Sequence, residues 1–278
     1  MMVEQFSENG IYSRHNDFIP GRFSLVFIHG LSGSSSAWKY YGERLGNDYN
    51  LLFFDLRGHG RSSKYSNYSD YDLEKISADI FDLTKENNLN NILLVGHSYG
   101  CLLALDFLSR YKNAVNGAVF LSPNFKIRDI FLVKTLSPLF LVGGLLSSLP
   151  FGKRSGHHVD YSRYPNSGDW DARRMAADIG NTTIRVCLYY MKQIYDFDIA
   201  RKTLSDIVAV PVLIIHGDRD TVLPLSYSID LAKKLKNAKL VVLRNANHIL
   251  AMNNAREVAD EIEKFVKELA LPGQRPRA

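Results

Sequence analysis

Serine, histidine and aspartate can together carry out acyl transfer, and in this chain candidates of all three types follow directly after apolar segments. Ser98 is the centre of Gly96-His97-Ser98-Tyr99-Gly100, which matches the pattern G-x-S-x-G. In this pattern a sharp turn between a strand and a helix lifts the serine above the sheet, and the flanking glycines avoid collisions within the turn. The following helix also points its positive end at the serine, which favours a developing oxyanion. Ordinary turns contain the same pattern, but the apolar run before Ser98 and the helical pattern after it favour a nucleophile.

A serine hydroxyl needs a base that accepts its proton and a group that orients this base. His248 is the only one of the eight histidines that follows the last predicted strand, where it ends the segment Asn245-Ala246-Asn247-His248. Asp218 and Asp220 both lie just after another apolar run, and spacing alone does not separate them. The position within the motif favours Asp220 as the acid. We therefore predict that Ser98, Asp220 and His248 form a catalytic triad.

Negative charge on the substrate oxygen requires hydrogen-bond donors, and two backbone positions are suitable. The segment His29-Gly30-Leu31-Ser32-Gly33 follows the first strong strand run and forms a loop flanked by glycines. We predict that the N–H of Leu31 is one donor and that the N–H of Tyr99, directly after the serine, is the other. The alternative for the first loop is a plain turn between strand and helix. Loss of one such donor typically lowers turnover by ~10²–10³.

The segment Asp55-Leu56-Arg57-Gly58-His59-Gly60-Arg61-Ser62 also follows an apolar run and is rich in turn-forming and polar residues. We interpret it as structural, with Arg57 and His59 tying loops together. It contains no glycine-rich loop with a Walker lysine, so it does not indicate phosphate binding. No group of cysteines or histidines has metal-site spacing, since His157 and His158 are adjacent and point apart. We therefore expect neither a cofactor nor a metal.

The candidate residues depend on short apolar runs for their placement. We predict six strands from runs that are apolar throughout, as in parallel strands covered on both faces. They are Ser24–Ile28, Leu51–Asp55, Ile92–Gly96, Gly117–Leu121, Val212–His216 and Leu240–Leu243. A weaker run at Ile11–Arg14 predicts an additional edge strand.

Helical patterns alternate with these strands. Apolar residues spaced three and four apart predict amphipathic helices at Asp72–Asn87, Tyr99–Tyr111, Leu225–Leu235 and Ala255–Leu269. The alternation indicates crossover helices between parallel strands, so we predict an α/β fold with a mostly parallel central sheet and helices on both faces. In such a sheet the segments after the strands meet at one edge, which would bring the triad residues together.

The alternation stops between Pro123 and Ser205, where helical stretches and glycine or proline interruptions occur without a strand run. We predict that residues 123–205 form a helical cap, inserted into a core made of residues 1–122 and 206–278. Within the cap, residues 135–152 form an uncharged run whose length alone is marginal for a membrane span. Its prolines, glycines and serines argue against a span, so we interpret it as apolar cap structure.

Composition sets further limits on the class of protein. The 34 Lys and Arg residues are scattered among 29 Asp and Glu residues, so the net charge of +5 does not indicate a nucleic-acid partner. Cys101 and Cys187 both lie in helical patterns and do not suggest a disulfide framework. Residues 1–9 carry two glutamates and no apolar core, unlike a secretory signal. We expect a cytoplasmic protein, and its oligomeric state stays open.

Together these residues resemble the α/β-hydrolase family, specifically the capped serine esterases and lipases that include monoacylglycerol lipases. The resemblance spans most of the chain and rests on the following landmarks: His29-Gly30, Asp55–Ser62, the turn at Ser98, Gly217-Asp218-Arg219-Asp220, and His248. The family order of serine, acid and histidine is met, and the family's acid position matches Asp220 rather than Asp218. An aspartate in place of Ser98 would have indicated an epoxide hydrolase or dehalogenase. A His-Gly-Gly-Pro-Gly loop would have indicated a proline iminopeptidase, and this chain has neither feature.

The resemblance implies an α/β-hydrolase fold and hydrolysis of carboxylic esters through an acyl-enzyme on Ser98. The apolar stretch Leu139–Leu149 of the cap implies a hydrophobic acyl site and a surface that contacts lipid. The same scaffold also serves carbon–carbon bond hydrolases and amidases, and it can bind a ligand without turnover. The intact triad argues against a non-catalytic receptor. The acyl-chain length, the alcohol portion of the ester and the physiological role are not determined by the sequence.

Overall fold

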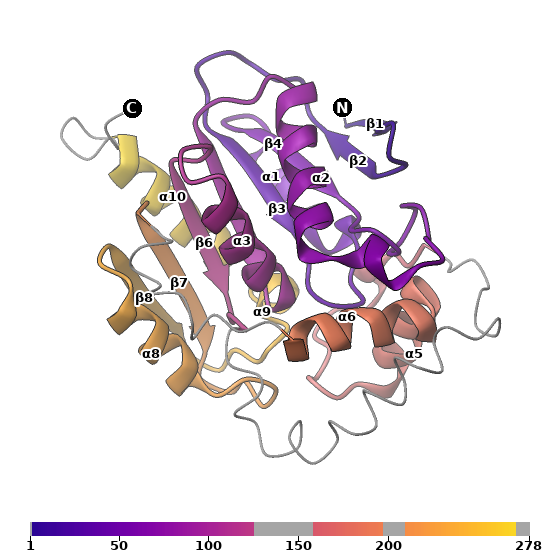
Figure 1. The fold of residues 1–278 in the computed structure, drawn as a ribbon. Coiled ribbons are helices and arrows are strands. Elements are labelled where there is room, and N and C mark those ends of the chain that lie inside the picture. The colour runs from indigo at the N-terminus through magenta and orange to yellow at the C-terminus, as the bar shows by residue number, and fades with distance from the viewer. Residues whose placement is uncertain (1, 125–157, 197–208, 271–278) are drawn as a thin grey trace.

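A computed structural model describes residues 2–124, 158–196 and 209–270, and every structural statement below concerns these residues. They form a central sheet with helices on both faces, and further helices lie at the end of the sheet where the parallel strands finish (Figure 1). The predicted fold class is therefore confirmed. None of the helices in these three ranges combines the length and the apolar character that a membrane crossing requires.

The sheet has eight strands in the order β1-β2-β4-β3-β5-β6-β7-β8. The two amino-terminal strands pair antiparallel with each other and with β4, and the strands from β4 to β8 are parallel. The strands are β1 Val3–Phe6, β2 Tyr12–His15, β3 Ser24–Ile28, β4 Asn50–Phe54, β5 Ile92–His97, β6 Gly117–Leu121, β7 Val212–Gly217 and β8 Ala238–Leu243. All six predicted parallel strands are present within about two residues of their expected bounds. The weak run at Ile11–Arg14 forms strand β2, but its predicted place at the edge is wrong, because β2 pairs with both β1 and β4. The edge strand β1 was not predicted.

The helices lie between and beyond these strands. The α-helices are α1 Lys39–Leu45, α2 Leu73–Glu86, α3 Tyr99–Arg110, α5 Ala172–Thr182, α6 Ile184–Asp196, α8 Leu225–Lys234, α9 Leu250–Asn253 and α10 Ala255–Ala270. Short 3₁₀ helices are η1 Ser35–Trp38, η2 Tyr68–Tyr71 and η4 Tyr161–Arg163. The four predicted helices correspond to α2, α3, α8 and α10.

Two hydrophobic cores form because successive side chains of a strand point to opposite faces of the sheet. In β3, Val26 and Ile28 pack on the face covered by α2, α3 and α8, whereas Leu25 and Phe27 pack on the face covered by α1 and α10 (Figure 1). All four side chains are fully buried. The central strands are therefore apolar throughout, as predicted. Strand β8 was also predicted to be covered on both faces, and this prediction is wrong. The strand lies at the sheet edge, and its Val242 is 41% exposed.

The order of the strands places the loops that follow β3 and β5 at a topological switch point. The chain leaves β3 towards β4 on one side and then crosses to β5 on the other side. Ligands in open α/β sheets bind outside the carboxyl ends of the strands at such a point, because the two crossovers diverge and leave a crevice. The segments after β3 and β5 contain Leu31 and Ser98, and the neighbouring strand ends lead to Asp220 and His248.

The predicted cap is represented in the structure by residues 158–196, which include η4, α5 and α6. Helices α5 and α6 lie beyond the carboxyl ends of the parallel strands (Figure 1). Tyr190 on α6 is fully buried and donates a hydrogen bond from its hydroxyl to the main-chain oxygen of Arg57 at 2.9 Å. The apolar run at 135–152 lies outside the described residues, and the boundaries of the cap stay a prediction.

Candidate active site

Ser98 occupies a sharp turn between β5 and α3. Its backbone has φ +51° and ψ −112°, a conformation that side-chain-bearing residues rarely adopt. The turn is possible because its flanking glycines lack side chains: a Cβ on Gly96 would lie 2.7 Å from the Gly100 carbonyl carbon, and a Cβ on Gly100 would overlap the main-chain oxygen of Ile28. The serine side chain consequently faces the space above the sheet, at the start of α3.

A chain of hydrogen bonds joins the three residues predicted as a triad. Ser98 Oγ lies 3.0 Å from His248 Nε2, and His248 Nδ1 lies 2.8 Å from Asp220 Oδ2. The carboxylate is an acceptor, so the imidazole carries its proton on Nδ1 and directs the lone pair of Nε2 at the serine hydroxyl. The structure thus brings Ser98, His248 and Asp220 together from loops after three different strands. The side chain of the competing residue Asp218 is exposed.

The Asp220 carboxylate is fully buried and well supplied with donors. Its Oδ1 accepts hydrogen bonds from the N–H groups of Val222 and Leu223, at 2.9 and 2.8 Å, while Oδ2 faces His248. Burial alone would raise its pKa, but the hydrogen bond and the charge of His248 and the backbone donor Leu223 outweigh this effect and lower the pKa to about 2. The acid is therefore an anion at neutral pH and can orient the imidazole.

His97, the residue before the serine, supports His248 from the other side. Its Nε2 lies 2.8 Å from the main-chain oxygen of His248, to which it donates a hydrogen bond. Burial and the neighbouring His248 lower the pKa of His97 to about 3, so it stays neutral. His97 is only a variable position of the motif, so the sequence did not predict this contact.

The loop that contains Leu31 is held by two buried histidines in neutral form. His29 accepts from the Leu56 N–H at 3.0 Å through Nε2, and His59 accepts from the Ser32 N–H at 3.1 Å in the same way. The Nδ1 atoms bond to the main-chain oxygens of Gly30 and Arg57. Burial lowers the pKa of both imidazoles. The interpretation that His59 ties loops together is therefore confirmed.

Leu31 and Tyr99 both line the same cavity as Ser98. Tyr99 is the first residue of α3, and N–H groups in the first turn of a helix have no acceptor within the helix. The positions of both residues are compatible with the predicted donation of backbone N–H groups to a substrate oxygen. That role stays a prediction.

The Asp55–Ser62 segment has the structural role predicted from its sequence. Arg57 forms a buried ion pair with Asp79 of α2, in which Nη2 and Oδ1 are 2.7 Å apart. The Asp55 carboxylate is buried and accepts hydrogen bonds from the N–H groups of Ser35 and Arg61. These contacts tie the loop after β4 to α2 and to the start of η1.

Two cap residues that were not predicted from the sequence contact the loops of the core. Asn181 is fully buried and donates through Nδ2 to the main-chain oxygens of Ser32 and Gly33, at 3.1 and 2.6 Å. Asp169 accepts a hydrogen bond from the N–H of His248 at 2.8 Å. No motif in the sequence marks either residue, because their partners are distant along the chain.

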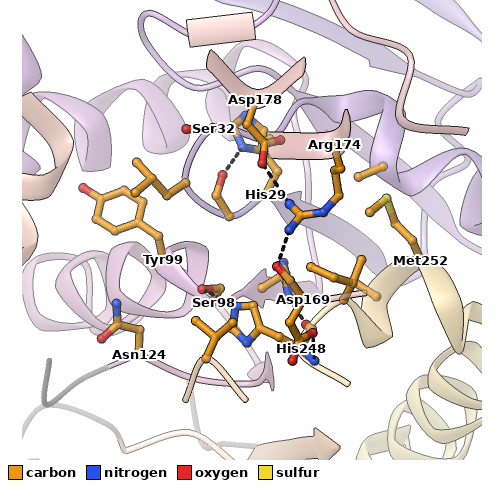
Figure 2. Close-up of a pocket in the computed structure, with 18 of the residues that line it drawn as sticks. His29, Ser32, Ser98, Tyr99, Asn124, Asp169, Arg174, Asp178, His248 and Met252 are labelled. Atoms are coloured by element: carbon orange, nitrogen blue, oxygen red, sulfur yellow. Dashed lines mark hydrogen bonds and ion pairs between the residues drawn. The ribbon is translucent and has the colours of Figure 1, made fainter. Parts of the chain in front are cut away.

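A cavity of about 420 Å³ lies between the sheet edge and the cap. Figure 2 shows Ser98, His248 and Asp169 close together, with Arg174 and Asp178 lying farther from Ser98. Much of the remaining wall is apolar and includes Leu31, Met191, Ile194, Val222, Leu223 and Met252. A cavity of this size and lining accommodates a small molecule with a substantial hydrophobic portion.

Comparison with known proteins identifies the family. The family model of the alpha/beta hydrolase fold matches residues 24–255. A proline iminopeptidase named PfmaB, from Pestalotiopsis fici, is 28% identical over 291 residues, which cover 96% of this chain and 100% of the relative.

Two solved structures share the fold. An alpha/beta hydrolase enzyme from a Medee basin deep-sea metagenome library has a TM-score of 0.74 and 20% identity, with 99% of this chain and 100% of that chain covered. An esterase from Exiguobacterium antarcticum has a TM-score of 0.70 and 18% identity, with 96% and 100% covered. Because the family model matches most of the sequence, the chain belongs to the alpha/beta hydrolase fold family.

Proposed function

We propose that this hydrolase cleaves carboxylic esters through an acyl-enzyme on Ser98. The observation that carries the proposal is the hydrogen-bonded series Ser98 Oγ–His248 Nε2–Asp220 at the wall of a largely apolar cavity. This arrangement supplies a nucleophile, a base and an orienting acid, which is the set that acyl transfer through a serine requires.

In the proposed reaction, Ser98 Oγ attacks the ester carbonyl carbon while His248 Nε2 takes the hydroxyl proton. The N–H groups of Leu31 and Tyr99 stabilise the negative charge on the tetrahedral intermediate. His248 then gives the proton to the alcohol oxygen, the carbon–oxygen bond breaks and the acyl group stays on Ser98. Water, activated by His248, releases the acid and restores the serine. Asp220 stabilises the imidazolium in both steps and keeps its own negative charge.

The cavity wall supports a substrate with an apolar acyl or alcohol portion. Leu31, Met191 and Ile194 come from the loop after β3 and from α6, and Val222 and Leu223 come from the loop after β7. Burial of apolar surface contributes roughly 25 cal/mol per Å², so each additional methylene that fits the cavity strengthens binding by about 0.8 kcal/mol. Affinity should therefore increase with chain length until the volume is filled.

A second reaction, amide hydrolysis, is supported by the name of one relative. The protein from Pestalotiopsis fici is called a proline iminopeptidase, and it aligns over nearly the whole of this chain. The same nucleophile and base would serve an amide, although the leaving nitrogen must then be protonated by His248. Ester cleavage is preferred here because an alcohol leaves more readily and the cavity wall is largely apolar.

The test measures initial rates on p-nitrophenyl esters and monoacylglycerols of increasing chain length, with proline p-nitroanilide as the amide. The Ser98→Ala variant is the blank, and a fluorophosphonate probe measures active serine in both proteins. We expect ester turnover and stoichiometric labelling of the wild type, with a loss of roughly 10⁶-fold in the variant. Ester turnover that persists in Ser98→Ala contradicts the proposal. Cleavage of the amide alone would favour the second reaction.

A further inference from the structure

A buried carboxylate of the cap, Asp169, bonds to both loops that carry His248 and Asp220. Its Oδ1 accepts a hydrogen bond from the backbone N–H of His248 at 2.8 Å. Its Oδ2 accepts from the N–H and the hydroxyl of Thr221, at 2.9 and 2.7 Å. Asp169 is 8% exposed and lines the cavity beside His248 (Figure 2). One side chain thus contacts the proposed base itself and the residue next to the proposed acid.

These three bonds connect loops that belong to different strands. Thr221 lies in the loop after β7, His248 lies in the loop after β8, and Asp169 comes from the segment that leads into α5. The separation of His248 Nδ1 and Asp220 Oδ2 depends on how the two loops are placed relative to each other. All three hydrogen bonds converge on the two oxygens of a single buried carboxylate. Asp169 therefore fixes the distance between the loop after β7 and the loop after β8.

Further contacts fix the place of Asp169. Arg174 on the first turn of α5 donates from Nη2 to the main-chain oxygen of Asp169 at 2.7 Å and from Nη1 to Asp178 Oδ2 at 2.8 Å. Figure 2 shows Arg174 between these two acidic residues. Asp178 Oδ1 lies 2.7 Å from the Tyr161 hydroxyl, which in turn lies 2.6 Å from the main-chain oxygen of Ser32. Asp169 is thus part of a polar network that reaches the loop containing Leu31.

We propose that Asp169 is a positioning residue, which aligns the His248 imidazole with Ser98 and Asp220. Proton transfer therefore depends on how the cap packs on the core. This inference rests on the proposed serine-hydrolase function. A residue that only attached the cap would affect stability and substrate binding. A positioning residue changes the rate of the chemical step, since a misplacement of about 1 Å at a reacting group can lower the rate by ~10²-fold.

The experiment compares Asp169→Ala and Asp169→Asn with Asp171→Ala as a matched control. The Asp171 carboxylate caps α5 by accepting from the Arg174 N–H at 2.8 Å, so its loss weakens the same helix. The measurements are kcat and KM for the best ester, the rate constant of fluorophosphonate labelling, the thermal midpoint, and the downfield proton resonance of the His248–Asp220 hydrogen bond.

We expect Asp169→Ala to lower kcat and the labelling rate by about 10²-fold, with KM changed by less than about threefold, and to broaden or remove the downfield resonance. Asn keeps one acceptor oxygen, which serves only one of the two backbone N–H groups. Its kcat should therefore lie between those of wild type and Asp169→Ala. Asp171→Ala should have a lower thermal midpoint and a kcat within about twofold of wild type, because its carboxylate bonds to the helix.

Each outcome separates the inference from the function on which it rests. A wild type that neither reacts with the probe nor cleaves esters contradicts the proposed function. An active wild type with an equally active, folded Asp169→Ala overturns the positioning role, and so does an Asp171→Ala variant that loses as much kcat. If Asp169→Ala does not fold, Asp169→Asn decides. Wild-type kcat in the Asn variant overturns the inference, whereas a reduced kcat with unchanged KM supports it.

Discussion

At the scale of single residues, Asp220 combines burial with a stabilised negative charge. Its pKa is about 2 in the folded chain, below the ordinary value of 3.8. A carboxylate whose pKa is lowered by folding stabilises the native state above its unfolded pKa, and the contribution disappears as the pH falls through the folded pKa. The lowered pKa corresponds to about 2 kcal/mol at neutral pH, of which roughly half is lost by pH 3.

Replacement of Asp220 by Asn should therefore flatten the acid side of the stability profile. Between pH 6 and pH 3, we expect the free energy of unfolding to fall by about 1 kcal/mol less in Asp220→Asn than in wild type. Urea titrations at both pH values measure this difference. Asn also cannot accept from His248 Nδ1 through its amide nitrogen, so turnover should drop by ~10⁴-fold. An equal pH dependence in the two proteins would show that Asp220 does not carry the effect.

The residues that could be predicted from the sequence are those that a local motif identifies. Ser98 is identified by its glycines and by the strand and helix beside it, and Asp220 and His248 by their positions after strand runs. Asp169 and Asn181 could not be found in this way. Their partners His248 and Ser32 lie far away in the sequence, and they become neighbours only when the cap packs on the core. An aspartate in a turn, such as Asp169, or an asparagine in a helix, such as Asn181, has no sequence feature that distinguishes it from a surface residue.

At the scale of elements, the close approach of α3 to β3 decides where Ser98 sits. Gly100 lies in the first turn of α3, and a side chain there would overlap the main-chain oxygen of Ile28 at the end of β3. Gly180 lies in α5, where an added Cβ has no neighbour within 4 Å. The two glycines therefore provide a matched pair of substitutions in helices.

We expect Gly100→Ala to lower the free energy of unfolding by about 1–3 kcal/mol, because α3 must move away from β3. The same movement displaces Ser98 and the Tyr99 N–H, so the rate of fluorophosphonate labelling should fall as well. Gly180→Ala should instead stabilise the chain by up to about 1 kcal/mol, since alanine favours the helix, and should label at the wild-type rate. Urea unfolding and labelling kinetics measure both effects. Wild-type stability of Gly100→Ala would contradict the packing argument.

The buried ion pair of Arg57 and Asp79 links another loop to a helix. Arg57 is 8% exposed and Asp79 is 3% exposed, and burial raises the pKa of the Asp79 carboxyl. Removal of one partner leaves a buried charge without compensation, so Asp79→Ala should lower the free energy of unfolding by about 3–5 kcal/mol. The double variant Arg57→Met with Asp79→Leu removes both charges and should be less destabilised than Asp79→Ala. Urea titrations of both variants test this order of stability.

Elements were predictable where burial imposed a clear pattern. The strands β3, β5, β6 and β7 are covered on both faces, so their runs are uniformly apolar and their bounds agree closely with the structure. Strand β1 was missed because it lies at the sheet edge with most of its side chains exposed. Helix α1 has only two buried residues, Tyr41 and Leu45, and is too short to show a helical period. Weak burial at the periphery leaves little signal in the sequence.

At the scale of the whole molecule, the parts that carry the chemistry follow parallel strands between β3 and β8, away from the amino-terminal edge strand. The proposed catalytic residues follow β3, β5, β7 and β8, whereas β1 pairs only with β2. Phe6 of β1 is 57% exposed, and Glu4 forms a surface ion pair with Arg61. Such pairs contribute at most about 1 kcal/mol. The edge strand therefore adds little to the stability of the site.

A chain that lacks residues 2–6 should keep its catalytic activity and lose solution monodispersity. Without β1, strand β2 presents unpaired backbone N–H and C=O groups at the sheet edge, and such an edge can pair with another chain. We expect kcat within about twofold of wild type, a free energy of unfolding lower by about 1–3 kcal/mol, and light scattering that increases with protein concentration. A folded variant with the wild-type thermal midpoint but without activity would show that the edge strand supports the site. Because His29 and His59 join the loops after β3 and β4, and the cap holds the loop after β3, that outcome is not expected.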